Sequence, residues 1–255
     1  MKEVTLIPPA QLDELYGHVE LDEIQDVLTE LKELHEKLRA SEGQMVLDLT
    51  GDLGRSRKML ARNKRDLIQA IRAFENDFSA GNFTDEDEIL NALMEFSRSL
   101  HNYLAMVHSV RDHAYRVLNK LDDDDLRDQY TTKLQETGLA KRGSFVADLR
   151  NYVQHRRVPV VTGRIQSHGT NQIIFDREKL ATWNDWSSDG QERLMEMEEE
   201  FEIEDEIESY QSINETFYDW FISTIGERYV DEIKERDEII EEIVQIQQDK
   251  LINRS

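Results

Sequence analysis

Residues 143–166 read GSFVADLRNYVQHRRVPVVTGRIQ, and the change of pattern within them decides the fold that the sequence predicts. Up to His155 the apolar residues recur at helical spacing, whereas β-branched residues dominate after Pro159. A residue that precedes a proline is pushed out of helical geometry, so Pro159 predicts the end of a helix. The segments 158–166 and 171–176 predict two strands joined by a polar loop, which together make a β-hairpin.

Helices are predicted on both sides of this hairpin. The chain has 255 residues with only 3 prolines and 11 glycines, so long segments contain no strong helix breaker. The expected helices lie near 21–38, 56–78, 84–110, 122–134 and 143–158, with one or two more after residue 187. We therefore predict a mainly α protein, a helical bundle with long antiparallel helices and one small β-hairpin insertion at about 158–176.

The expected organisation has three parts. Residues 1–157 would form a helical bundle, 158–186 the hairpin and a linker, and 187–255 an acidic C-terminal helical region packed on the same domain. The stretch MVLDLTGDLG at 45–54 fits either a helix or a short extended piece. Thr84 is the expected N-cap of its helix, because acidic residues follow it in the first turn.

Apolar residues at helical spacing predict which faces of these helices are buried. In the first helix the stripe is narrow and follows heptad spacing, through Leu21, Ile24, Leu28, Leu31 and Leu38. In the last helix the predicted inward residues are Ile233, Ile240, Val244 and Leu251.

The charge of the chain is strongly negative and unevenly distributed. The formal net charge is −23, and residues 187–255 contain 22 Asp and Glu against 6 Lys and Arg. An acidic chain repels nucleic acid at long range, so any RNA contact has to rest on local basic patches. Cysteine is absent, which excludes disulfides, thiolate zinc sites and a cysteine nucleophile. The sequence shows neither a signal peptide nor an apolar run of membrane-spanning length, so we expect a soluble, cytoplasmic protein without membrane contact.

One segment inverts this charge. Within residues 141–157 a single acidic residue stands against five basic ones, which are Lys141, Arg142, Arg150, Arg156 and Arg157. On a helix, Arg150, Asn151 and His155 fall within an arc of about 140° on the side away from the apolar residues. An imidazole can accept or give a proton near neutral pH, and a guanidinium can hold a phosphate with its planar fork of donors. These groups suit cleavage of RNA by its own 2′-hydroxyl, although an ordinary solvated helix face would look the same.

The spacing Arg150-Asn151-x-x-x-His155 resembles the R-x4-6-H signature of the HEPN superfamily, including the polar residue after the arginine. The direct match covers six residues, and a helical context extends it over about 85–157. HEPN proteins are helical bundles, and many are metal-independent ribonucleases that act as toxins or antiviral defence effectors. Two copies typically dimerise so that their motifs form one composite site.

The resemblance implies a role for each motif residue. Arg150 and His155 would be catalytic and Asn151 would support them, without a cofactor or a metal. It also implies an RNA substrate, a homodimer, and a possible cognate antitoxin or defence partner. The surrounding positive charge makes four further residues candidates for RNA binding, namely Lys141, Arg142, Arg156 and Arg157.

Other patterns leave alternatives open. A second basic stretch at 54–72 would extend an RNA groove or, as we favour, pair with the chain's own acidic segments. The acidic run MEMEEEFEIEDEIE at 195–208 predicts a solvated helix with a packed stripe, a partner surface, or an arm that masks the basic patch. Three histidines, His101, His108 and His113, lack the i to i+4 spacing of a helical metal pair. The competing function is a non-catalytic helical adaptor or protective partner, and an acidic nucleic-acid mimic is a third.

Overall fold

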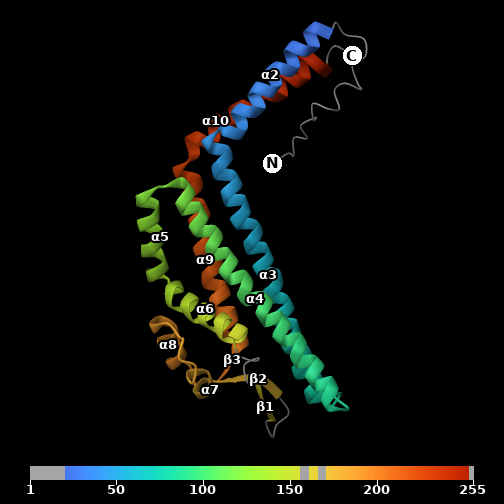
Figure 1. Ribbon diagram of the computed structural model, residues 1–255, viewed down its shortest axis with the longest axis vertical. Coiled ribbons are helices and arrows are strands. Elements are labelled where there is room, and N and C mark those ends of the chain that lie inside the picture. Colours follow the sequence, from blue (N-terminus) through green and yellow to red (C-terminus); the bar gives the residue numbers. More distant parts are fainter. Residues whose placement is uncertain (1–20, 156–160, 166–170, 253–255) are drawn as a thin grey trace. The chain divides into compact units, whose positions relative to one another are not determined.

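Figure 1 shows the computed structural model, which describes residues 21–155, 161–165 and 171–252. In these residues long helices accompany one small sheet, so the predicted mainly α class with a β-hairpin is confirmed. The chain divides into two compact units, one made of residues 1–49 and 224–255 and the other of residues 50–223. This division differs from the expected boundaries at 157 and 186, and it splits the acidic C-terminal region between the two units.

The first unit is built around two helices from opposite ends of the chain. Helix α2 (Leu21–Ala40) lies beside α10 (Val230–Ile246), which continues into the π-helical segment η1 (Gln247–Ile252) (Figure 1). The two helices run antiparallel, since Lys250 pairs with Glu30 at 2.6 Å while Glu232, near the start of α10, lies against Gly43, just after the end of α2. Their shared core consists of Val27, Leu31, Leu34, Leu38, Ile239, Ile243 and Ile246.

This core confirms part of the predicted stripe of α2, in which Leu28 is only half-buried, and it corrects the face of α10. Leu31 and Leu38 are buried as expected, and Val27 and Leu34 complete the seam. In α10 the buried residues are Ile239, Ile243 and Ile246, whereas Ile240 and Val244 are only half-buried. Ile239 and Ile243 are each followed directly by another apolar residue, so the spacing alone did not identify the inward face.

Helix α3 (Glu42–Ala80) begins only one residue after α2 ends. The hydroxyl of Ser41 donates to the Leu38 carbonyl at 2.8 Å and accepts from the Gln44 backbone N–H at 3.3 Å. The ambiguous stretch 45–54 is therefore helical. Gly43 lies in this first turn of α3, and a Cβ there would be 2.1 Å from the carbonyl oxygen of Glu232, so only glycine fits.

The second unit combines the rest of α3 with α4 (Glu86–Leu121), α5 (Asp124–Glu136), α6 (Leu139–His155) and α9 (Ile203–Arg228). Aromatic side chains dominate the core between them, because a ring buries more apolar surface than any aliphatic side chain. Its fully buried rings are Phe96, Tyr103, Tyr130, Phe145, Phe175, Phe217 and Phe221.

The start of α4 corrects one prediction. The N-cap is Asp85, whose carboxylate accepts from the Glu88 backbone N–H at 3.0 Å, and not Thr84. Thr84 still takes part, because its backbone N–H donates to Oε2 of Glu88 at 2.7 Å. The two contacts form a reciprocal cap in which the threonine sits one position before the N-cap.

The sheet contains the predicted hairpin and one more strand. Strand β1 (Val161–Ile165) pairs antiparallel with β2 (Asn171–Asp176), and β2 pairs with β3 (Glu200–Glu202), which the sequence did not predict. Pro159 and the hairpin loop lie outside the described residues. Between β2 and β3 come the short helices α7 (Arg177–Ala181) and α8 (Ser188–Met195).

Candidate functional site

Helix α6 is held in the second unit by its apolar face. Phe145, Leu149 and Tyr152 are buried there, as predicted. The Phe145 ring stacks on Trp186 with centroids 5.6 Å apart, and Tyr152 meets Trp183 edge to face at 5.7 Å. The two tryptophans, expected in a linker, therefore anchor the helix that carries the motif.

The opposite face of α6 presents the motif. Arg150 and Asn151 are half-buried, and His155, the last residue of the helix, is exposed. The Nε atom of Arg150 is buried without a hydrogen-bond partner. Asn151 and His155 are one helical turn apart, so the three side chains share one end of the helix. Arg156 and Arg157 lie outside the described residues.

Asp148, the single acidic residue of the basic segment, has a structural contact. Its carboxylate is buried, and Oδ2 accepts hydrogen bonds from the backbone N–H of Ser187 at 2.8 Å and from the Ser187 hydroxyl at 2.6 Å. Ser187 is the N-cap of α8. Asp148 thus fixes α6 against the start of α8.

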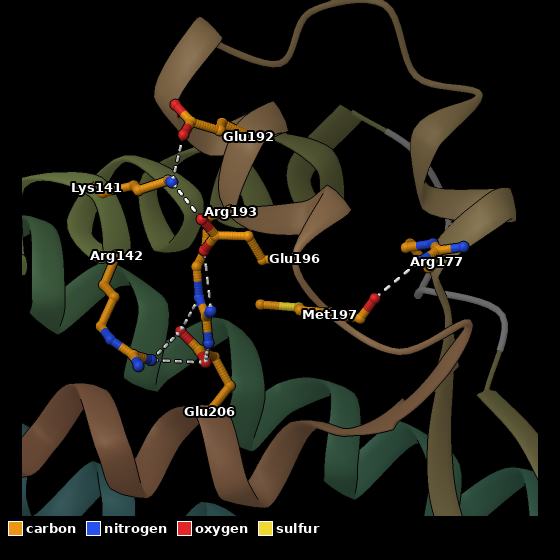
Figure 2. A network of polar contacts seen from close by, with 8 residues as sticks. All are labelled: Lys141, Arg142, Arg177, Glu192, Arg193, Glu196, Met197 and Glu206. Atoms are coloured by element: carbon orange, nitrogen blue, oxygen red, sulfur yellow. Dashed lines mark hydrogen bonds and ion pairs between the residues drawn. The ribbon is translucent and has the colours of Figure 1, made fainter.

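Lys141 and Arg142, both predicted to bind RNA, contact carboxylates of the same unit (Figure 2). The Nζ of Lys141 lies 2.7 Å from Oε1 of Glu192 and 2.5 Å from Oε1 of Glu196. Hydrogen bonds to these two glutamates raise the pKa of Lys141. An RNA-binding role for this lysine would require both ion pairs to open.

Arg142 belongs to a more buried arrangement centred on Glu206. Its Nη1 donates to both carboxylate oxygens of Glu206, at 2.9 and 2.8 Å, and Arg193 contacts the same carboxylate from α8 (Figure 2). Only 6% of Glu206 is exposed. The hydrogen bond to Glu206 raises the pKa of Arg193. Two guanidinium groups therefore neutralise one buried carboxylate, which joins α6, α8 and α9.

The second basic stretch is paired in the same way. On α3, Arg57 lies 2.6 Å from Asp219, Lys64 lies 3.4 Å from Glu208, and Arg72 lies 2.6 Å from Glu204. All three acidic partners are on α9. The favoured interpretation, in which this basic face pairs with the chain's own acidic segment, is confirmed for these residues.

The described histidines of α4 are not placed to bind a metal ion together. Nδ1 of His108 lies 3.1 Å from Oδ2 of Asp112, one turn further along the helix. Across the described residues, no group of His, Asp and Glu side chains is placed to hold a metal ion. His108 instead lines a cavity between α4, α5, α6 and α9, and none of the three motif residues does.

Sequence reasoning missed this cavity and the tyrosines that line it. The available signal was on α6, where small residues recur at helical spacing, at Ala140, Gly143 and Ala147. Small side chains along one helix face leave space that neighbouring helices fill only in part. Tyr130 and Tyr210 come from α5 and α9, so their meeting at this place depends on the tertiary fold.

Comparisons with protein-family models, with curated proteins and with solved structures found no match to this chain. The resemblance to HEPN proteins therefore rests on the motif residues. In the described parts of the chain, no helix combines the length and the apolar composition that crossing a membrane requires.

Proposed function

We propose that the C-terminal end of α6 is the cleavage site of a HEPN-like, metal-independent endoribonuclease that acts as a toxin or an antiviral effector. The strongest support for this proposal is the hydrogen bonding of Arg150. Its Nε has no hydrogen-bond partner, whereas Lys141 and Arg142 on the same helix are held by carboxylates. A half-buried guanidinium and an exposed imidazole at the same end of a helix are the groups needed to bind a phosphate and move a proton.

The proposed reaction uses the RNA's own nucleophile. His155 takes the proton of a 2′-hydroxyl, whose oxygen then attacks the adjacent phosphorus. Arg150 binds the phosphate oxygens and stabilises the charge that develops on them, and Asn151 orients the imidazole or the phosphate. The bond from phosphorus to the 5′-oxygen breaks, and the leaving oxygen takes a proton from the partner subunit's His155. The products are a 2′,3′-cyclic phosphate and a 5′-hydroxyl.

The direct test measures cleavage of a mixed-sequence RNA in the presence of a chelator. Loss of a general base or of a transition-state donor lowers rates by about 10²- to 10⁴-fold, so Arg150→Ala and His155→Ala should each do so. Two exposed residues provide matched controls: His101→Ala removes another imidazole, and Gln154→Ala alters the same helix turn. Wild-type cleavage by Arg150→Ala or His155→Ala would contradict the proposal.

The proposed homodimer gives a second readout. If two motifs complete one site, activity per molecule should rise with protein concentration until the dimer is fully formed, and sedimentation should show dimer over the same range. Full activity in a strictly monomeric sample would contradict the composite site but leave single-chain cleavage possible.

A non-catalytic adaptor or protective partner is the second candidate, and the ion pairs favour it. Lys64, Arg72 and Arg142, all in basic stretches, contact carboxylates of the same unit. Their charge is therefore not free to attract phosphates at long range. Isolation of the protein without RNA, without cleavage activity and with one stoichiometric protein partner would support this function.

A further inference from the structure

The cavity between α4, α5, α6 and α9 has the features of a small-molecule site. Its volume is about 190 Å³. Engineered protein cavities of about 150 Å³ hold a benzene molecule, so this one has room for a single six-membered ring with a small substituent. All the residues that line it belong to the second unit.

The inner lining of the cavity is apolar and aromatic. Leu104, Val107 and Leu139 are buried in its wall, together with the rings of Tyr130 and Tyr218. The Tyr130 ring already packs edge to face on Phe217 at 5.0 Å and on Phe221 at 4.9 Å. Aromatic walls of this kind favour a planar ring as occupant, because ring pairs gain attraction beyond the area they bury.

The α6 side of the cavity is open because its residues are small. Gly143 lines the cavity, and a Cβ built on it would meet no atom within 4 Å. Ala140 and Ala147 lie one turn before and one turn after it on the same face. A larger side chain at 143 would therefore enter the empty space without displacing backbone.

The outer lining carries a positive charge. Arg111 is exposed, and its Nη2 lies 3.5 Å from Nε2 of the half-buried His108. In the described part of the chain Arg111 forms no ion pair with a carboxylate, unlike Arg142 and Arg193 across the same unit. Burial raises the pKa of both Tyr130 and Tyr210, and the charge of Arg111 opposes this rise slightly. A cation at the entrance of an aromatic cavity suits an anionic end group.

We infer that this cavity binds a small aromatic acid, a molecule with one six-membered ring and one carboxylate. The ring lies among the apolar side chains and tyrosines, and the carboxylate contacts Arg111 at the entrance. The inference is independent of the proposed nuclease, because neither Arg150 nor His155 lines the cavity.

Calorimetric titration of the full chain with benzoate tests this inference. A ligand of nine non-hydrogen atoms should bind with a dissociation constant on the order of 0.1–1 mM. Benzyl alcohol, with the same ring and no charge, should bind at least about tenfold more weakly, because it cannot form a charge-assisted hydrogen bond with Arg111.

Three variants separate the parts of the site. Arg111→Met should weaken the binding of benzoate about tenfold or more and leave the binding of benzyl alcohol unchanged. Arg116 is an exposed arginine on the same helix that does not line the cavity, so Arg116→Met should change the affinity for neither ligand. Gly143→Leu should fill the cavity and abolish binding of both ligands. This variant should fold, because leucine favours a helix over glycine and the space is empty.

Several results would overturn the inference. It fails if wild-type protein does not bind benzoate, or if Gly143→Leu binds it as well as wild type does while its circular dichroism is unchanged. Equal benzoate affinity of Arg111→Met and wild type would remove the assigned role of the cation. Binding of hexanoate without binding of benzoate would overturn the aromatic class of the ligand.

Discussion

Oδ2 of Asp148 lies 2.1 Å from the position that a Cβ on residue 190 would take, so the carboxylate on α6 occupies the space beside Gly190 of α8. The same oxygen accepts two hydrogen bonds from Ser187, whose hydroxyl in turn accepts one from the Gly190 backbone N–H at 3.1 Å. The Asp148 carboxylate thus fixes the helix that carries the motif to α8, and it leaves no space for a side chain at residue 190.

Gly190→Ala should therefore destabilise the protein. The added methyl group collides with a carboxylate that is held in place, and overpacking of this kind costs about 1–3 kcal/mol. Urea unfolding followed by circular dichroism measures the change. Gly226→Ala in α9 is the matched control, because a Cβ there meets no atom within 4 Å, and it should stabilise by about 0.5–1 kcal/mol. Equal stabilities for the two variants would contradict the close approach.

Arg142→Ala should be among the most destabilising substitutions on the polar face of α6. It leaves the buried Glu206 with Arg193 as its remaining cation, so the cost should stay below the about 3–5 kcal/mol of a buried charge that loses its only partner. Arg98→Ala breaks the exposed pair with Glu95, where 58% and 53% of the two side chains are exposed, and should leave the stability almost unchanged because solvent screens such a pair. Thermal unfolding of both variants gives the comparison.

The stability of the protein should fall at alkaline pH partly because of Tyr130. Burial raises the pKa of Tyr130 to about 12, while a hydrogen bond with Tyr218 acts in the opposite direction. Unfolded tyrosine ionises near pH 10, so the folded state holds this proton more tightly. Its contribution is complete below about pH 10 and is lost by about pH 12, at about 1.4 kcal/mol per pH unit.

Tyr130→Phe keeps the ring and removes the ionisation. The free energy of unfolding of this variant should fall less steeply between pH 10 and pH 12 than that of wild type, as measured by urea unfolding at several pH values. Identical slopes for Tyr130→Phe and wild type would show that this phenol does not titrate as described.

Ile243→Ala should loosen both helices of the first unit. Ile243 is fully buried between α10 and α2, and truncation of such a residue costs about 2–5 kcal/mol. Amide hydrogen exchange should become faster in α2 and in α10 together, since each helix depends on the other for its apolar contacts. Ile240→Ala, at the half-buried neighbour, should have a smaller effect, and a larger effect there would favour the face originally predicted from the sequence.

Local patterns predicted the helices well and their partners poorly. The stripe through Leu31 and Leu38 was read correctly because heptad spacing depends only on neighbouring turns. That it packs on Ile243, about 200 residues later, is a tertiary property. Nothing in the acidic run distinguished Glu206 from the neighbouring glutamates, because its burial and its pairing with Arg142 and Arg193 depend on other helices. The motif spacing of Arg150 and His155 was visible in the sequence, whereas the cavity beside Gly143 arises only where four helices meet.

The pairing of α2 with α10 has a consequence for synthesis on the ribosome. Helix α2 is made early, and about 190 further residues must be added before α10 begins. At roughly 5–20 residues per second, the apolar face of α2 in the nascent chain stays without its α10 partner for about 10–40 s. During this time it is a site for chaperones or for pairing with another unfinished chain, so slow translation of the last third should increase aggregation.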